Sequence, residues 1–500
     1  MPRAANSMPK PPTITPGDET EIRVAQAWFW EGNFARRGIS LKHHYQTDSL
    51  EVTDLDLLAI ELTSTLEPHK YIGESKSGKA TSAAKPLDRI IWLRGLMDLL
   101  GDISGAELTT VKRPPNPIVD LAAPLCVIFQ SVEDLERREL RLRMETLADY
   151  GSQGREAFLI AKRVQATVKE DPELDRAFWL LRSEIWFLDK WMGIKRLLAA
   201  IDAISKRWSP KIKDESGEAV SWLLAEAVGV FSLFLIMASA PALRLSPSEF
   251  MAFAANHLAD SGVDPRRMRQ LSDAIDKYVA GLLNQAKAPR ALMVESMGAF
   301  APSAPLYTEA LAETARRLTS RVDIARSLPR YMDLIAHERL VRQREPGPVV
   351  VSELDGGHVL ALARASRILL AFLAGNASLP QPVVDLLGRP PMPAVLRVRT
   401  DEQEARAVAI SSPVTVEPNS QETTSVVPAP SPDQGQPPAA PAPEPAAGIA
   451  GIPVALPGMR SSGEEPAPRP GLWSLAEPES KYGSKDTEDE PTPPKEADPR

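Results

Sequence analysis

The sequence predicts an α/β domain followed by a mainly α-helical region and a Pro-rich acidic tail. Short apolar runs alternate with helical patterns early in the chain, and helical periodicity alone follows. Beyond Thr400 the sequence turns to Pro, Ala, Ser and Glu, which is too poor in apolar residues to form a core. We therefore expect a flexible arm (1–19), an α/β domain (20–150), a helical domain (151–400) and a disordered tail (401–500).

The α/β domain is predicted to have the element order α-β-β-β-α-β-α-β-α. Three adjoining strands followed by crossover units favour a mixed sheet flanked by helices. The predicted elements are helix Glu21–Phe34, strands Ile39–Tyr45, Val52–Leu62 and Lys70–Lys76, helix Leu87–Leu100, strand Leu108–Val111, helix Ile118–Ala123, strand Cys126–Phe129 and a charged helix from Ser131 onward.

The helical domain carries two apolar stripes at helical spacing, and we expect both to form bundle core. A base-stacking platform built from exposed tryptophans is the alternative for the first stripe. The first stripe is Phe178, Trp179, Leu181, Ile185, Trp186, Leu188, Trp191 and Ile194, and the second is Met268, Leu271, Ile275, Tyr278, Val279 and Leu282.

The segment Ala219–Leu243 contains 25 residues and a single charge, Glu226. This length would cross a bilayer, and basic residues at 206, 207, 211 and 213 would hold the N-terminal domain in the cytoplasm. Glu226 and Pro241 argue against a span. We expect a buried helix, with membrane tethering as the alternative.

Composition limits the partners and the compartment. The chain has 58 Lys/Arg and 66 Asp/Glu residues, of which 7 and 17 lie in the tail. The first 400 residues therefore contain 51 basic and 49 acidic residues. A near-neutral body requires a local basic patch for any nucleic-acid contact. One cysteine, Cys126, cannot form an intramolecular disulfide, and the first seventeen residues lack a signal-peptide apolar run, so a cytoplasmic location is expected.

Two predicted strands carry acidic and basic side chains on one face. Residues two apart on a strand share a face, which aligns Asp54 with Asp56 and Glu74 with Lys76. If the strands pair, Asp56, Glu74 and Lys76 converge at one end of the sheet. Two carboxylates suit Mg²⁺, or Mn²⁺ in its place, and a lysine beside the metal can position the attacking water.

The segments Val52–Ala59 and Tyr71–Lys76 resemble the signature of the restriction-endonuclease-like PD-(D/E)xK nuclease superfamily. The resemblance covers about residues 20–150, a quarter of the chain, and extends to the order of the strands and helices. It implies a nuclease whose first metal ligand is Asp56, whose second is Glu74, whose third is the main-chain carbonyl of Ser75 and whose catalytic lysine is Lys76.

The sequence departs from that signature in one place. The motif proline corresponds to Thr53 or Leu55, so Asp54 is an alternative ligand, and Asp56 is favoured because the apolar run begins directly after it. Glu21 resembles a helix-borne acid that some members add to the metal site, although a solvated helix-start glutamate is the commoner case. Candidate phosphate-binding residues are Lys79, Lys85, Arg89 and Arg94.

A competing interpretation uses the same segment. Gly73–Ala80 fits the G-x4-G-K part of a phosphate-binding P-loop. However, Ala80 stands where a Mg²⁺-binding Ser or Thr is required, and the segment from Ala80 to Pro86 is predicted as loop, not helix.

The first functional hypothesis is therefore a Mg²⁺-dependent phosphodiesterase that cuts DNA in preference to RNA, with water as the nucleophile. The second is a catalytically inactive nuclease-fold binding or scaffold protein, with a membrane-associated helical domain. The third is a P-loop nucleotide binder. The helical region and the tail, with its apolar island Leu472–Leu475, are candidate docking segments for a protein partner.

Overall fold

The protein is described by a computed structural model that covers residues 13–45, 48–76, 86–210, 214–259, 265–285, 304–355 and 358–391. These residues belong to one compact unit, Met1–Val414. The predicted arm up to residue 12 and the predicted tail lie outside the described residues, as do Lys79 and Lys85.

The N-terminal part has the predicted element order. Helix α1 begins before its predicted start because Thr15 caps it in a capping box with Asp18, and Pro16 occupies the first turn. The elements are α1 (Pro16–Trp30), β1 (Phe34–Tyr45), β2 (Asp48–Leu62), β3 (Pro68–Lys76), α2 (Pro86–Leu100), β4 (Ile103–Thr110), α3 (Asn116–Ala122), β5 (Val127–Ser131) and α4 (Val132–Arg141).

The five strands form one mixed sheet in the order β1-β2-β3-β4-β5. The first three strands are antiparallel, and β3, β4 and β5 are parallel, as the crossover helices require. Helix α1 packs across β1, β2 and β3, and a Cβ on Gly73 would lie 2.7 Å from Trp28. The glycine therefore permits the close approach of helix and sheet.

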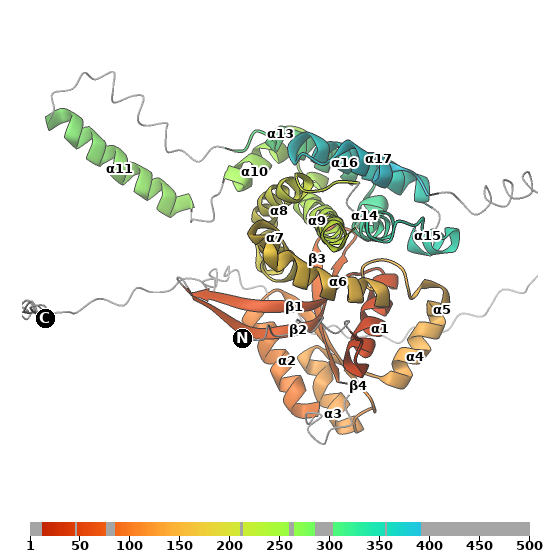
Figure 1. Ribbon diagram of the computed structural model, residues 1–500. Coiled ribbons are helices and arrows are strands. Elements are labelled where there is room, and N and C mark those ends of the chain that lie inside the picture. Colours follow the sequence, from red (N-terminus) through yellow and green to blue (C-terminus); the bar gives the residue numbers. More distant parts are fainter. Residues whose placement is uncertain are drawn as a thin grey trace, which may run out of the picture. The chain divides into compact units, whose positions relative to one another are not determined.

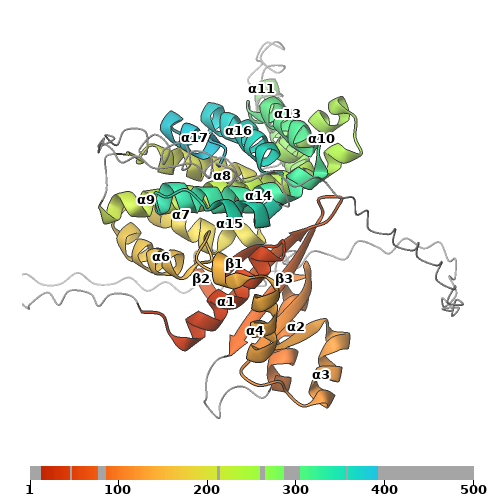
Figure 2. The same cartoon turned by 90° about the vertical axis from the view of Figure 1, so that its right-hand side faces the viewer.

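The helical part lies against β1 and β2. Figures 1 and 2 show α7, α8, α9 and α14 on one side of the β1–β2 hairpin, with α2 and α3 on the opposite side. Its elements are α5 (Met144–Leu147), α6 (Arg155–Thr167), α7 (Pro172–Arg182), α8 (Lys190–Ser205), α9 (Glu215–Ser239), α10 (Pro247–Ala259), α11 (Pro265–Gln285), α13 (Thr308–Thr319), α14 (Val322–Ala336), α15 (Pro348–Asp355), α16 (Val359–Asn376) and α17 (Gln381–Gly388).

Helix α9 is the central element of the helical part. It and the following turn, Glu215–Leu243, are long and apolar enough to cross a membrane, and the apolar window is 100% buried by other parts of the chain. The prediction that this helix is buried within the protein is confirmed. A second helix of sufficient length and hydropathy, Val359–Asn376, is 44% buried.

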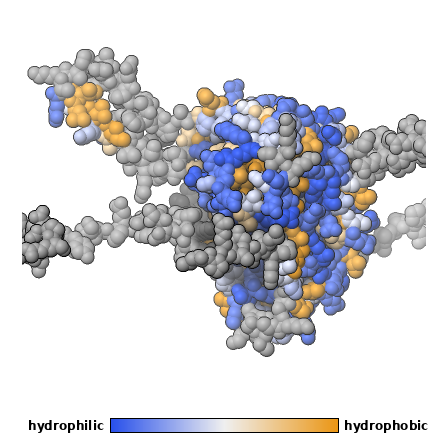
Figure 3. Space-filling model, in the orientation of Figure 1, coloured by the Kyte–Doolittle hydropathy of each residue, from blue (hydrophilic) through white to orange (hydrophobic). Residues whose placement is uncertain are grey.

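The two predicted apolar stripes have different environments. In the first stripe, Phe178, Trp186 and Trp191 are buried, which confirms a bundle core. In the second, on α11, Tyr278 and Leu282 are 69% and 47% exposed, so the expected burial of that face is wrong at these positions. Figure 3 shows the apolar side chains on the surface of α11.

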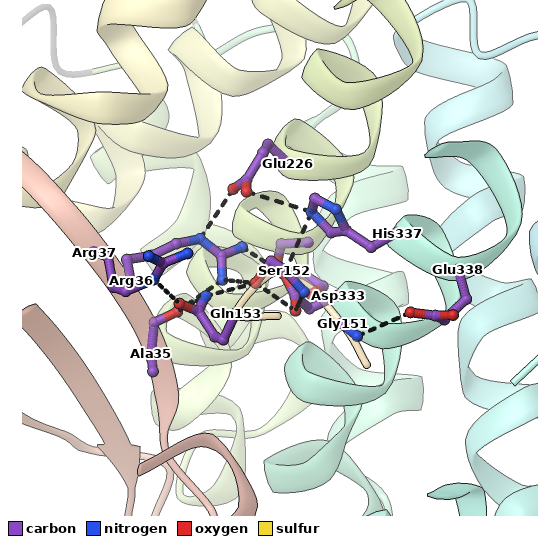
Figure 4. A network of polar contacts seen from close by, with 12 residues as sticks. Ala35, Arg36, Arg37, Gly151, Ser152, Gln153, Glu226, Asp333, His337 and Glu338 are labelled. Carbon is purple, nitrogen blue, oxygen red and sulfur yellow. Dashed lines mark hydrogen bonds and ion pairs between the residues drawn. The ribbon is translucent and has the colours of Figure 1, made fainter. Parts of the chain in front are cut away.

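A buried polar network joins β1 to the helical part (Figure 4). Arg36 of β1 lies 2.7 Å from Asp333 of α14 and 2.9 Å from Glu226 of α9, and all three side chains are at most 5% exposed. Ser152 donates a 2.8 Å hydrogen bond to Asp333, and His337 Nε2 lies 3.3 Å from Glu226. Burial alone would raise the pKa of Glu226, but Arg36, with His337 and Arg182, lowers it to about 2.

We predict that removing one charge from this network destabilises the protein strongly. Glu226→Gln leaves Arg36 with a single buried carboxylate and should lower the free energy of unfolding by about 3–5 kcal/mol. The control is Glu218→Gln on the same helix, because the pair of Glu218 with Arg163 is partly exposed and should contribute within about 1 kcal/mol. Denaturant unfolding of the two variants measures the difference, and equal effects would contradict the prediction.

Candidate active site at the fork between β2 and β3

The candidate site lies where β2 and β3 stop pairing. The antiparallel ladder begins with Leu57 opposite Gly73, so Asp56 and Glu74 lie just beyond its end. From this point β2 continues beside β1, and β3 continues beside β4 as far as Lys76. The two strands thus separate and leave a fork that is flanked on both sides by paired strands.

The structure brings Asp56, Glu74 and Lys76 together at this fork. Lys76 Nζ lies 2.5 Å from Glu74 Oε1 and 3.8 Å from Asp56 Oδ2. The Ser75 N–H donates a 2.8 Å hydrogen bond to Asp56 Oδ2. Because the N–H and C=O of one strand residue project toward the same edge, the Ser75 carbonyl also faces the fork.

Both carboxylates of the fork are largely shielded from solvent, and the charge of Asp56 is unfavourable there. The Glu74 side chain is 4% exposed and that of Asp56 is 20% exposed. Burial and the neighbouring Glu74 raise the pKa of Asp56 to about 6, against the opposing effects of the Ser75 N–H and Lys76. A divalent cation between Asp56 and Glu74 would relieve this repulsion, so the donor set fits a hard metal ion.

Glu21 of α1 joins the site electrostatically. Burial raises the pKa of Glu21 to about 7, with the charge of Asp56 as the next cause and Arg37 opposing it. Glu21 is only partly exposed, which differs from the environment of a solvated helix-start glutamate. Among the described residues no cluster of three or more His, Cys, Asp or Glu side chains is close enough to hold a metal ion, so Glu21 lies outside the immediate ligand set.

The remaining predicted residues divide into two groups. Arg89 of α2 lies 3.5 Å from Glu74 and stacks over the Trp92 ring, so it belongs to the site. Arg94 is bound to Asp98 at 2.6 Å on the surface of α2, and among the described residues no ion pair or hydrogen bond joins it to the fork. Asp54 is exposed and makes no ion pair with a described residue. The structure thus favours Asp56 over Asp54 as the fork carboxylate.

The P-loop interpretation does not agree with the backbone of this segment. Residues Gly73 to Lys76 are strand and pair with β4, with Gly73 opposite Glu107. A P-loop would place this glycine in a loop around a phosphate, whereas here the glycine makes room for Trp28. Lys79 itself lies outside the described residues.

Arg37 was not anticipated as a member of this region. It lies on β1 opposite Leu57, next to the position of Asp56, and its charge acts on Glu21. Two arginines followed by Gly38 resemble a turn more than a strand, which is why the predicted strand starts only at Ile39. Arg37 could have been placed near Asp56 only if the strand had been predicted to begin at Phe34. That start depends on pairing with β2.

Comparisons of the chain with family models, with curated proteins and with solved structures find no match. The chemistry of the fork therefore has to be inferred from its own residues.

We predict that the ionised Asp56 destabilises the metal-free protein. Its pKa rises from 3.8 in the unfolded chain to about 6 in the fold, so its contribution to stability is present below pH 4 and is lost as the pH rises through about 6. In a chelator at pH 7.5, Asp56→Asn should raise the free energy of unfolding by about 1–2 kcal/mol, after allowance for partial exposure.

Thermal unfolding between pH 4.5 and 7.5 measures this difference. The gap between Asp56→Asn and the wild type should widen with pH, and added Mg²⁺ should raise the Tm of the wild type but not that of the variant. The prediction would be contradicted if Asp56→Asn were less stable than the wild type at pH 7.5 without divalent ions.

Proposed function

We propose that the protein is a Mg²⁺-dependent nuclease of the PD-(D/E)xK type that hydrolyses phosphodiester bonds in DNA. The observation that carries the proposal is the convergence of Asp56, Glu74 and Lys76, with the Ser75 main chain, at the fork between β2 and β3. The mixed sheet with its α-β-β-β-α-β core supports it.

The carboxylates of Asp56 and Glu74 and the carbonyl of Ser75 are the groups that would hold the metal ion. When bound, Mg²⁺ would polarise the phosphoryl group and lower the pKa of a bound water. Oxygen donors in this number match a cation that keeps several positions for water and phosphate.

Lys76 has two roles in the proposal. In the structure it neutralises Glu74, and with a metal on the carboxylate its ammonium is free to hydrogen-bond the attacking water. Arg89, partly exposed beside Glu74, is placed to bind the phosphate that is cleaved. Glu21, with a pKa of about 7, is a candidate to take up the proton that the water releases.

Cleavage assays on a panel of DNA and RNA substrates test the proposal. Asp56→Asn and Glu74→Gln should each reduce metal-dependent cleavage by about 100-fold or more, because they remove metal ligands. Lys76→Ala should reduce cleavage by about the same factor while the Mg²⁺-induced rise in Tm remains.

The matched control for Lys76 is Lys70→Ala. Lys70 lies six residues earlier on the same strand and the same face, where it binds Asp102 outside the fork. The Lys70→Ala variant should cleave DNA at the wild-type rate. If Lys79→Ala abolishes activity while Lys76→Ala is mild, the P-loop hypothesis replaces this one. If the wild type binds DNA and never cleaves it, the protein is a binding protein with a nuclease fold.

A further inference from the structure

Arg182 of the helical part reaches β1 at Gly38. It ends α7, and its Nη2 lies 3.1 Å from the position that a Cβ on Gly38 would occupy. Gly38 lies between Arg37, which faces Leu57, and Ile39, which faces Leu55, so its partner across the ladder is Asp56. The guanidinium therefore lies against β1 one strand away from a fork carboxylate.

Gly38 is required for this arrangement in two ways. Its φ of +57° is in the left-handed region, which favours glycine. A Cβ at this position would also lie 3.1 Å from Arg182 Nη2, which is closer than an ordinary contact, so the guanidinium would have to shift. The sequence thus provides space over β1 for a charged group that arrives from a helix 144 residues later in the chain.

The positive charge of Arg182 has no close counterion. Among the described residues no ion pair or hydrogen bond to its guanidinium is found, and the acid with the largest effect on its charge, Glu226, is already paired with Arg36. Asp54 is near enough to act on its charge. The residue is partly exposed, and burial lowers the pKa of its guanidinium.

Arg37 adds a second cation to the same region. Burial, followed by the charge of Arg182, lowers the pKa of Arg37 to about 9. Its Nη1 is buried and has no hydrogen-bond partner in the described residues. The repulsion between these two guanidinium groups lowers the stability of the fold. An anion bound between the helical part and β1 would offset that repulsion.

We propose that Arg182 binds the backbone phosphate next to the one cleaved at the fork, with Arg37 strengthening the positive field behind it. A nucleic-acid strand carries a phosphate at every nucleotide, so a strand held at Asp56 brings a neighbouring phosphate toward Gly38. This inference rests on the proposed nuclease function, and it gives the helical part a direct role in holding the substrate.

Binding of a DNA oligonucleotide to the full-length chain in a chelator tests the proposal without cleavage. Arg182→Ala should weaken binding about 5–10-fold near 0.1 M salt and should reduce the slope of log K against log salt by about one phosphate contact. Arg182→Lys, which keeps the charge, should retain most of the slope. The matched control is Arg176→Ala, because Arg176 is exposed on the same helix.

Thermal unfolding separates a ligand-binding role from a structural one. Arg182 makes no ion pair or hydrogen bond with a described residue and acts on Glu226 and Asp54 only through their charges, so Arg182→Ala should change the Tm by no more than about 2 °C, whereas loss of a structural ion pair would lower it by several degrees. Arg182→Gln, which keeps the length of the side chain, replaces the alanine variant if that variant does not fold.

The outcomes distinguish this inference from the nuclease proposal. A wild type that cleaves or binds DNA, with an Arg182→Ala variant that has the wild-type salt slope or only a lowered Tm, overturns the role of Arg182 alone. A wild type that neither binds nor cleaves any nucleic acid overturns both.

Discussion

The buried ion pair of Arg36 with Asp333 and Glu226 is the interaction on which the arrangement of the rest depends. Arg36 is part of the strand that pairs with β2, and its two acidic partners belong to different helices. Taking three charges out of water is expensive, so the arrangement is stable only when all three partners are in place. The sheet and the helical part consequently fix each other's position along β1.

This fixed position has electrostatic consequences for the neighbouring residues of β1. Arg37 and Gly38 follow Arg36 directly, and they lie beside the strand that carries Asp56. Of the helical part, Arg182 acts on the charge of Arg37, whereas the groups that act on Asp56 belong to the sheet and to α2. Raised carboxyl pKa values next to guanidinium groups without a carboxylate partner are typical of sites arranged for a ligand rather than for stability.

The sequence predicts the element order of the first part because each element has a clear period and a clear boundary signal. Asp56, Glu74 and Lys76 were predictable as neighbours because strand alternation and antiparallel pairing determine their phase. The start of β1 and the first half of β4 were not predictable from the sequence. Arg36, Arg37 and Gly105 have low strand propensity, and they form strand only because they pair with neighbouring strands. The exposed face of α11 was missed because periodicity does not reveal what a helix packs against.

The fork also has a consequence for the backbone of the sheet. Strands that separate within a sheet create an interior edge, where main-chain groups such as the Ser75 N–H must find partners other than a neighbouring strand. Pairing of two further residues beyond Leu57 and Gly73, as far as Leu55 opposite Ser75, would close that edge and bury the same peptide groups in a ladder. The point at which β2 and β3 stop pairing therefore determines whether a ligand can reach main-chain groups at the centre of the sheet.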